Sequence, residues 1–209
     1  IGSFLLNEGG SRTNFIAGKS KYLVVEACEY KRSFLNLSPK ILVITNIDAD
    51  HLDYYKDLDD IKSAFAEMSA KSEKVITEKN YIKLSTLNLS LLVTGTHNVR
   101  NAQAALAVAE TLGIDREVAI KALNNFRGTW RRFEFKGEFN QAIIYDDYAH
   151  HPTEICATIS GARELYPTKR LIILFQPHLY SRTKQLLGDF AVSLALADMV
   201  LVGPIYAAR

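Results

Sequence analysis

All five histidines of the chain lie in polar segments that also contain Asp, Asn, Arg or Glu. His51, His150, His151 and His178 come after short apolar runs of the kind that form strands, and His97 begins a helical pattern. In open parallel sheets, ligands bind beyond the carboxyl ends of the strands. A single histidine in such a place is more often a solvated residue or a helix cap. Five of them with polar neighbours indicate one site between two lobes.

A cluster of carboxylates and one imidazole follows the apolar run at 41–45. It consists of Asp48, Asp50, His51 and Asp53. Together with Glu26, which follows an earlier apolar run, these side chains have the ligand chemistry of a hard cation such as Mg²⁺. The alternative is a loop that only caps the helix beginning near Leu58. A solvated face is expected for Glu29, Lys31 and Arg32.

Residues that suit a nucleotide lie further along the chain. Asn98 and Asn101 are three residues apart and share one face of a first helical turn, where they either cap the helix or, with His97, contact a base edge. Arginines near the lobe junction are either ordinary surface charge or well placed to bind a nucleotide phosphate; they are Arg127, Arg131 and Arg132. The segment at 18–20 is not a phosphate loop, because Thr13 occupies the position of the first glycine and a strand pattern follows.

Short apolar runs alternate with helical patterns, which predicts an α/β fold of two lobes, each a largely parallel sheet flanked by helices. Buried strands are expected at 22–26, 41–45, 142–145, 171–175 and 199–202. Helices are expected at 58–70, 99–112, 116–126, 152–166 and 183–196. The stretch 69–92 fits either small strands or loops. Gly113 suits a helix C-cap, and Pro152 with Glu154 suits a first helical turn. A boundary near Gly128 would divide the chain into 1–128 and 129–209.

Composition excludes several classes of function. The chain has 209 residues, 48% of them hydrophobic, and a formal charge of +2, which favours neither nucleic acid nor a membrane surface as partner. Its apolar runs are too short for a membrane helix. The two cysteines, Cys28 and Cys156, form no metal or disulfide pattern, so we expect a reducing cytoplasm. Because the sequence begins without Met, we expect a longer natural polypeptide.

A series of motifs resembles the Mur ligases and runs in order along nearly the whole chain. The motifs are Glu26-Ala27-x-Glu29-x-x-x-Ser33-Phe34, Thr45-Asn46-Ile47-x-x-Asp50-His51-Leu52-Asp53, Gly95-x-His97-Asn98-Val99-x-Asn101, Phe126-x-Gly128-x-x-Arg131-Arg132-Phe133, Asp146-Asp147-Tyr148-x-His150-His151-Pro152-Thr153-Glu154 and Phe175-Gln176-Pro177-His178-x-Tyr180-Ser181-Arg182-Thr183. The resemblance implies an enzyme of three domains. This chain matches the later part of the central ATP-binding domain (1–128) and the front of the C-terminal Rossmann-like domain (129–209), and it lacks the phosphate loop and the UDP-sugar domain.

Within the family, the last two motifs resemble the branch that joins L-alanine to UDP-N-acetylmuramate. The implied reaction is ATP-dependent amide formation through an acyl phosphate, in peptidoglycan precursor synthesis. The resemblance implies Mg²⁺ at Glu26 and His51, and ATP at His97, Asn98, Asn101, Arg131 and Asp147. It implies substrate contacts at His150, His151, His178 and Arg182. Catalytic roles fall to His51, His178 and Arg182. The resemblance then implies small-molecule substrates as partners, and it leaves open whether the protein forms a homo-oligomer.

Three positions depart from the family pattern. They are Cys28 in place of Asp, Ala149 in place of Gly, and Leu179 in place of Arg, of which the last affects a substrate contact. The alternatives are a recycling ligase of the same superfamily that adds an intact peptide, a metal-dependent phosphohydrolase, and a nucleotide-binding fragment without catalysis. Arg182 is expected in a surface crevice, so that its replacement changes stability by less than about 1 kcal/mol.

Overall fold

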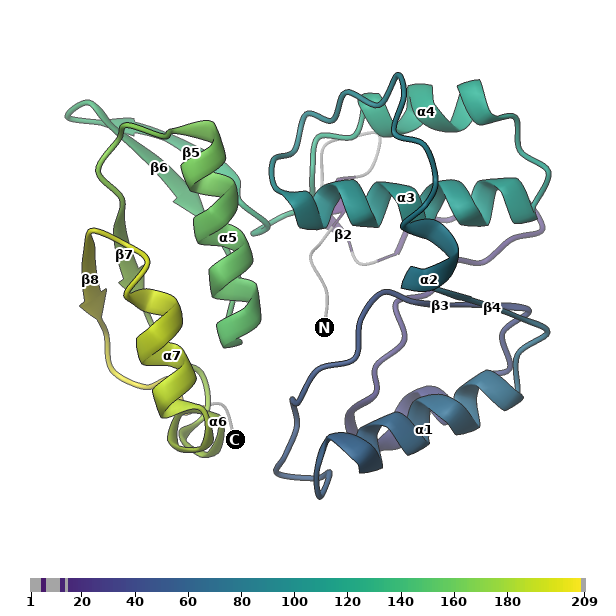
Figure 1. Ribbon diagram of the computed structural model, residues 1–209, viewed down its shortest axis with the longest axis horizontal. Helices are drawn as coiled ribbons and strands as arrows, with labels where there is room; N and C mark the ends of the chain where they lie inside the picture. Colours follow the sequence, from purple (N-terminus) through teal and green to yellow (C-terminus); the bar gives the residue numbers. More distant parts are fainter. Residues whose placement is uncertain (1–4, 7–11, 14, 208–209) are drawn as a thin grey trace.

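The computed structural model describes residues 5–6, 12–13 and 15–207. Its elements form two groups that lie side by side, a first lobe that contains β3 to α4 and a second lobe that contains β5 to β8 (Figure 1). Two short strands, β1 (Leu5–Leu6) and β2 (Arg12–Thr13), form an antiparallel pair near the start of the chain.

The first lobe places helices on both faces of a parallel strand pair. Its elements are the 3₁₀ segment η1 (Tyr30–Asn36), β3 (Ile41–Ile44), α1 (Leu58–Ala70), β4 (Lys74–Thr77), α2 (Glu78–Tyr81), α3 (Thr96–Thr111) and α4 (Arg116–Asn124). Side chains of β3 alternate between the faces, so that Leu42 and Ile44 pack with α1 while Ile41 and Val43 pack with α3. The expected α/β class, with parallel strands flanked by helices, is thereby confirmed for this lobe.

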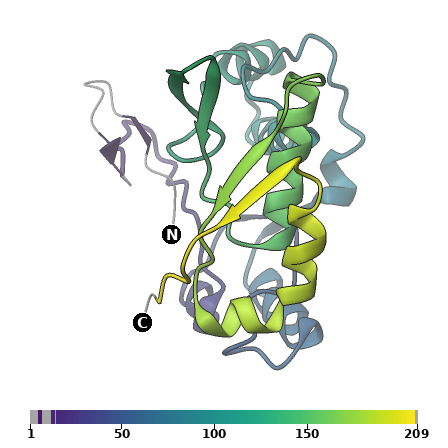
Figure 2. The same cartoon turned by 90° about the vertical axis from the view of Figure 1, so that its left-hand side faces the viewer.

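The second lobe combines a parallel strand pair with an antiparallel hairpin. Its elements are β5 (Glu134–Phe139), β6 (Ala142–Asp146), α5 (Pro152–Leu165), β7 (Ile172–Phe175), α6 (Tyr180–Gln185), α7 (Leu187–Leu194) and β8 (Met199–Val202). β7 pairs in parallel with β8, and β5 pairs antiparallel with β6. α5 and α7 cover one face of the β7–β8 pair (Figure 2). The core there consists of Ile155, Ile159, Phe175, Phe190 and Leu194.

The helix ends follow the capping residues of the sequence. Asp57 and Asp115 accept backbone N–H groups as N-caps of α1 and α4. Gly113, at φ 70°, closes α3, and the amide of Ile114 donates to the carbonyl of Ala109 in a Schellman motif. The predicted cap at Gly113 is confirmed. Within the described part of the chain, no helix is both long enough and apolar enough to span a bilayer.

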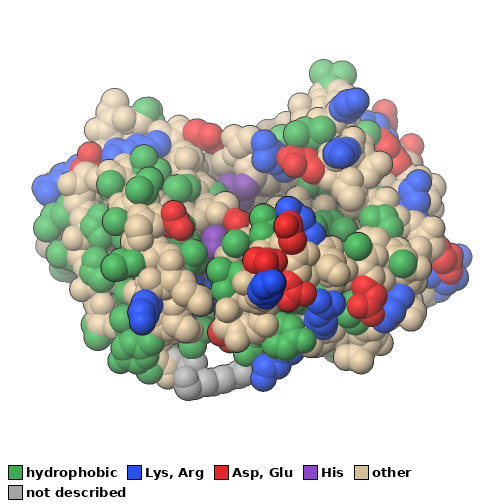
Figure 3. All heavy atoms as spheres, turned by 60° about the horizontal axis from the view of Figure 1, so that its bottom comes forward, with side chains coloured by type: hydrophobic (Ala, Val, Ile, Leu, Met, Phe, Trp, Pro, Cys, Tyr) green, Lys and Arg blue, Asp and Glu red, His purple; other side chains and the backbone are tan. Residues whose placement is uncertain are grey.

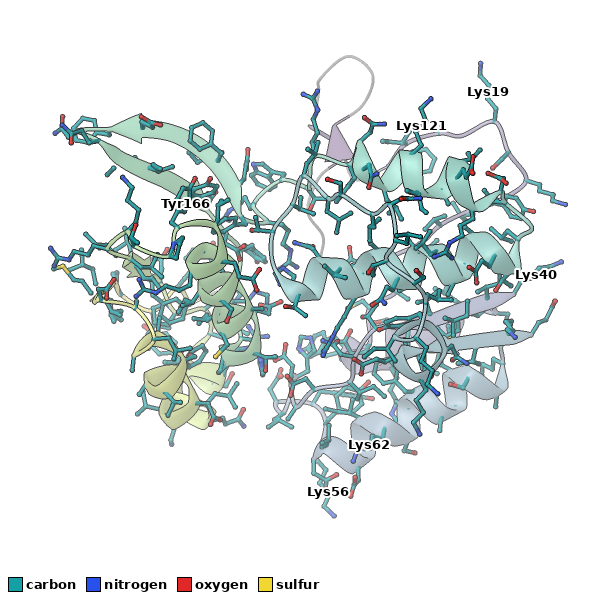
Figure 4. All side chains as sticks on the ribbon, turned by 45° about the horizontal axis from the view of Figure 1, so that its top comes forward. Lys19, Lys40, Lys56, Lys62, Lys121 and Tyr166 are labelled. Carbon is teal, nitrogen blue, oxygen red and sulfur yellow. The ribbon has the colours of Figure 1, made fainter. Side chains whose placement is uncertain are left out.

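Aromatic side chains attach the β5–β6 hairpin to α5. Phe133 stacks on Tyr145 with ring centroids 4.2 Å apart, and the hydroxyl of Tyr145 lies 2.7 Å from that of Tyr166 (Figure 4). The pKa of Tyr145 is raised to about 12, mainly by burial and secondly by this hydrogen bond. The hairpin is therefore fixed to the helix that carries His151 at its start.

Two predicted elements are wrong. Residues 22–26 form no strand, and Leu23 and Val24 are 76% and 94% exposed. A strand needs a neighbour to accept its backbone hydrogen bonds, and β3 pairs with β4 in the described sheet. The helix predicted at 183–196 is divided at Leu186, where φ −106° and ψ 20° interrupt the helical backbone.

The strands of the second lobe are less buried than predicted. Leu174 in β7 and Val202 in β8 are 77% and 64% exposed, since α5 and α7 cover one face of the pair. The undecided stretch 69–92 contains the short strand β4 and the helical turn α2. Apolar content alone does not distinguish a strand buried on both faces from one buried on a single face.

Candidate functional site

The lobes meet at the loop 48–51, which follows β3 and lies against α6. The Asp50 carboxylate accepts two hydrogen bonds from Arg182, at 3.0 Å from Nε and 3.1 Å from Nη2. The Arg182 side chain is 8% exposed and that of Asp50 is 24% exposed. Burial acts to raise the pKa of Asp50, but the Arg182 guanidinium and other neighbours outweigh it, so the pKa falls below its usual value. Arg182 is thus buried and does not lie in a surface crevice, so the premise of the small expected stability effect is wrong.

A second contact joins this loop to the start of α5. The hydroxyl of Thr153 donates to the Asp48 carboxylate at 2.6 Å. His151 accepts the Thr153 amide at Nδ1 as the helix N-cap, and its Nε2 lies 3.3 Å from the carbonyl oxygen of Ala49. An accepting Nδ1 leaves the ring proton on Nε2, which can then donate to that carbonyl. Both nitrogens of His151 are therefore engaged within the protein.

The first turn of α5 has the arrangement that its sequence predicts. Pro152 stands in the first turn, and the Glu154 carboxylate accepts the amides of His150 and His151 to complete a capping box. This cap fixes the direction in which the two histidine backbones enter the junction.

His51 lies on the other side of the same loop. Its backbone is left-handed at φ 56°, its Nε2 lies 3.4 Å from the Glu29 carboxylate, and its ring packs on Tyr30 at 4.8 Å. The hydrogen bond to Glu29 is the main cause that raises the pKa of His51, and the same bond lowers the pKa of Glu29. Glu29 is half-buried, so the solvated face expected for it is wrong, whereas Glu26 is exposed.

The donors around His51 fit a magnesium ion only if the substrate completes the site. Among the described residues, no three His, Cys, Asp or Glu side chains come close enough together to hold a metal ion. Magnesium in proteins usually binds one or two carboxylates together with substrate phosphates. The carboxylate of Glu29, which lies 3.4 Å from the His51 imidazole, fits that mode of binding, and His51 lies beside it.

His178 lies beside His150 near the same junction. The two ring centroids are 6.0 Å apart, and the His178 ring stacks on Tyr206 at 5.5 Å. Its buried Nδ1 has no hydrogen-bond partner in the described part of the chain. The pKa of His178 is lowered, mainly by burial and secondly by the nearby His150 and Arg182. The lowered pKa favours the neutral form of His178, whose Nδ1 has a hydrogen-bonding capacity that no described residue uses.

The residues predicted for a nucleotide base gather at the start of α3. The Asn98 amide nitrogen donates to the carbonyl of Thr94 at 2.7 Å, and the Asn101 amide lies 3.5 Å from Asn98. The Cε1 and Nδ1 atoms of the His97 ring lie next to Gly95. Partial burial of the ring lowers the pKa of His97. Asn98 therefore closes the turn before α3, and Asn101 is exposed.

Arg131 and Asp147 shape the connection between the lobes. Arg131 Nε donates to Asp146 at 3.1 Å, and its guanidinium lies over the ring of Tyr148 at 4.9 Å. Asp147 accepts the amides of Phe133 and Ala149, both at 2.7 Å. Both side chains thus have partners within the protein in this arrangement.

Left-handed backbone at residues other than glycine recurs around the junction. His51, Arg131, Phe133 and Leu179 have φ between 47° and 71°. Such conformations cost about 1 kcal/mol or more each and persist where the surroundings enforce them, often at functional sites. Leu179, one of the departures from the family pattern, adopts this backbone at the start of α6.

Around the junction, the described residues form a small cavity and a wider groove. The cavity, beside Asp50 and Arg182, measures about 10 Å³. The groove, about 470 Å³, lies between the start of α3 and the end of α5, with Gly95, Val99 and Glu164 in its wall. Figure 3 shows histidine and acidic side chains between the two halves of the molecule. The structure thus brings together His51 and Arg182 through Asp50, and His150 with His178. It places His97, Asn98 and Asn101 at the start of α3.

Comparison with protein families separates the same two parts of the chain. The Mur ligase middle domain matches residues 12–79, and a domain described as Mur ligase, glutamate ligase domain, matches residues 131–204. The chain belongs to the Mur ligase family. The resemblance seen in the motifs and the expected α/β fold are therefore confirmed.

Relatives within the Mur ligase family are similar over nearly the whole chain. The UDP-N-acetylmuramate--L-alanine ligase of Agathobacter rectalis is 40% identical, in an alignment that covers 94% of this chain and 53% of the relative. That of Clostridium acetobutylicum is 42% identical, with the same coverage. The chain therefore spans about half the length of these relatives.

Solved structures of the family share the fold. A UDP-N-acetylmuramate-alanine ligase from Thermotoga maritima superimposes with a TM-score of 0.66 at 30% identity, covering 84% of this chain and 48% of that one. A murein peptide ligase from Psychrobacter arcticus superimposes with a TM-score of 0.59 at 21% identity, covering 93% of this chain and 58% of that one. The second match supports the fold alone.

Proposed function

We propose that this chain is part of an ATP-dependent ligase that joins L-alanine to UDP-N-acetylmuramate. The observation that carries the proposal is the identity of about 40% to relatives of that name, over 94% of the chain or more. The recycling ligase is less favoured, because the relatives of about 40% identity carry the name of the alanine-adding enzyme.

The proposed reaction has two steps. A carboxylate oxygen of UDP-N-acetylmuramate attacks the γ-phosphorus of ATP, which gives an acyl phosphate and releases ADP. The amine nitrogen of L-alanine then attacks the acyl carbon, the bond from that carbon to the phosphate oxygen breaks, and inorganic phosphate leaves. The amine loses a proton as the amide forms.

Residues at the lobe junction suit these steps. His178 is neutral near pH 7, since its pKa is lowered, and can accept the proton of the amine. Arg182 can bind a carboxylate or phosphoryl group with its planar fork. We assign substrate contacts to His178 and Arg182, and to His150, whose ring lies beside that of His178. His151, a substrate residue by resemblance, we assign instead to joining the lobes.

Charge neutralisation is the main requirement of phosphoryl transfer. Bound Mg²⁺ would neutralise negative charge on the phosphates, held by His51 with Glu26 or Glu29. We assign the nucleotide to His97, Asn98, Asn101, Arg131 and Asp147. The existing hydrogen bonds of Asn98 and Asp147 would hold the surrounding turns in place for it.

Phosphate release tests the proposal in the natural full-length protein. With ATP, Mg²⁺ and UDP-N-acetylmuramate present, release should require L-alanine and should yield an amide product of the corresponding mass. Replacing L-alanine by a peptide tests the recycling ligase. Release without any amino acid would favour a phosphohydrolase and contradict the proposal.

A further inference from the structure

Asp50 binds Arg182 along one side of the guanidinium. The contact uses Nε and Nη2, at 3.0 and 3.1 Å from the two carboxylate oxygens. A guanidinium carries five N–H donors in one plane. The end of the fork, formed by Nη1 and the second hydrogen of Nη2, is not used by Asp50. Asp50 therefore does not compete with an anion for these N–H groups.

The ion pair holds Arg182 in a confined place. Only 8% of the Arg182 side chain is exposed, and the cavity beside the pair measures about 10 Å³. A space of that size admits about one water molecule. An arginine that is already fixed in one orientation loses little further freedom when it binds a ligand.

Asp50 is itself fixed by the loop to which it belongs. Its Oδ1 accepts the backbone amide of His51 at 2.7 Å, and its own amide donates to the Asp48 carbonyl at 3.0 Å. The same oxygen that accepts from His51 also accepts Arg182 Nε. The loop after β3 in one lobe thus determines where the guanidinium of the other lobe points.

We propose that Asp50 is a positioning residue that holds Arg182 across the lobe junction and leaves the end of its fork for a substrate anion. The proposal rests on the proposed ligase function. The anion is either the carboxylate of L-alanine or an anionic group of the muramate substrate. Asp50 acts through Arg182 and does not itself contact substrate.

The test replaces Asp50 by Asn in the full-length enzyme and measures kcat and KM with each substrate varied in turn. Asn is of similar size, but it lacks the charge and has one acceptor oxygen in place of two. The KM for the substrate that binds Arg182 should rise at least about 10-fold, as expected for weakening a charge-assisted hydrogen bond. The change in kcat should stay within about 3-fold, because the chemical groups remain in place. The substrate whose KM rises identifies the anion.

Two comparison variants separate positioning from lobe attachment and from loss of charge. Asp48→Asn weakens another contact between the lobes, to Thr153, without touching Arg182. Asp59→Asn removes an exposed carboxylate that pairs with the exposed Lys62 on α1, which is labelled in Figure 4. The Asp50 variant should exceed both in its effect on KM. An equal effect of Asp48→Asn, or a KM in the Asp50 variant that falls or stays unchanged, would overturn the proposal.

A spectroscopic measurement tests the positioning without catalysis. The Nε–H resonance of Arg182, identified by its absence in Arg182→Lys, should be protected from solvent exchange in the wild-type protein and lose that protection in Asp50→Asn. Equal protection in both proteins would contradict the proposal. If the wild-type enzyme shows no phosphate release that depends on L-alanine, the ligase function fails, while this resonance still reports on the role of Asp50.

Discussion

Replacing Arg182 by Ala should destabilise the protein as well as weaken substrate binding. Removing one partner of a buried ion pair usually costs about 3 to 5 kcal/mol, because the other charge stays buried without a partner. Asp50 retains 24% of its side-chain exposure, so water screens part of that penalty. We therefore expect a loss of about 2 to 3 kcal/mol in the free energy of unfolding.

Urea unfolding, monitored by the fluorescence of Trp130, the single tryptophan of these 209 residues, measures this loss. Arg182→Lys retains the charge but not the two parallel hydrogen bonds, so it should lose about 1 kcal/mol while KM still rises about 10-fold or more. Asp50→Asn combined with Arg182→Ala should be less destabilised than the sum of the two single variants, because no buried carboxylate then lacks its partner. Additive losses, or a loss below about 0.5 kcal/mol in Arg182→Ala, would refute the buried ion pair.

Three further predictions concern other residues of the site. His51→Ala in the full-length enzyme should lower kcat about 100-fold, and added Mg²⁺ should recover part of it; an unchanged rate and Mg²⁺ dependence would exclude His51 from the site. Glu29 raises the pKa of His51 above its ordinary value of 6.5. The contribution of their contact to the stability of the folded state is therefore fully present below about pH 6.5, and it is lost as the pH rises through the raised pKa. The difference in urea midpoint between wild type and Glu29→Gln should therefore be larger at pH 6 than at pH 8.5, and a constant difference would count against the contact. Gly95→Ala should destabilise more than Gly113→Ala in thermal melts, since both residues have positive φ but only at Gly95 would the added Cβ lie 2.6 Å from the His97 ring; equal losses would contradict this packing.

Local signals in the sequence predict most helix ends and several strands. Asp57, Gly113 and Pro152 mark helix ends through their own side chains or backbone preferences, so neighbouring sequence is enough to recognise them. The apolar run 22–26 has the same local pattern as β3 yet forms no strand, because pairing depends on a partner that lies elsewhere. Burial on one or both faces likewise depends on which helices cover the sheet.

The sequence predicts where the candidate site lies, but it does not predict which of the residues in the site contact each other. Polar residues after strand ends indicate the lobe junction, and the structure brings Asp50 to Arg182, 132 positions apart in the sequence. No local pattern reveals that partnership, nor those of Glu29 with His51 and Thr153 with Asp48, because each joins segments that only the fold brings together. The family motif that contains Glu29 is the signal in the sequence that could have indicated a role for this residue in the site.

Transfer of oxygen from the muramate carboxylate to phosphate tests the central claim most directly. UDP-N-acetylmuramate labelled with ¹⁸O in its carboxylate is incubated with the full-length enzyme, ATP, Mg²⁺ and L-alanine, and the released phosphate is analysed by mass spectrometry. An acyl phosphate intermediate requires one labelled oxygen to leave with each phosphate that is released. Unlabelled phosphate would show that the carboxylate is never phosphorylated and would contradict the proposed ligase function.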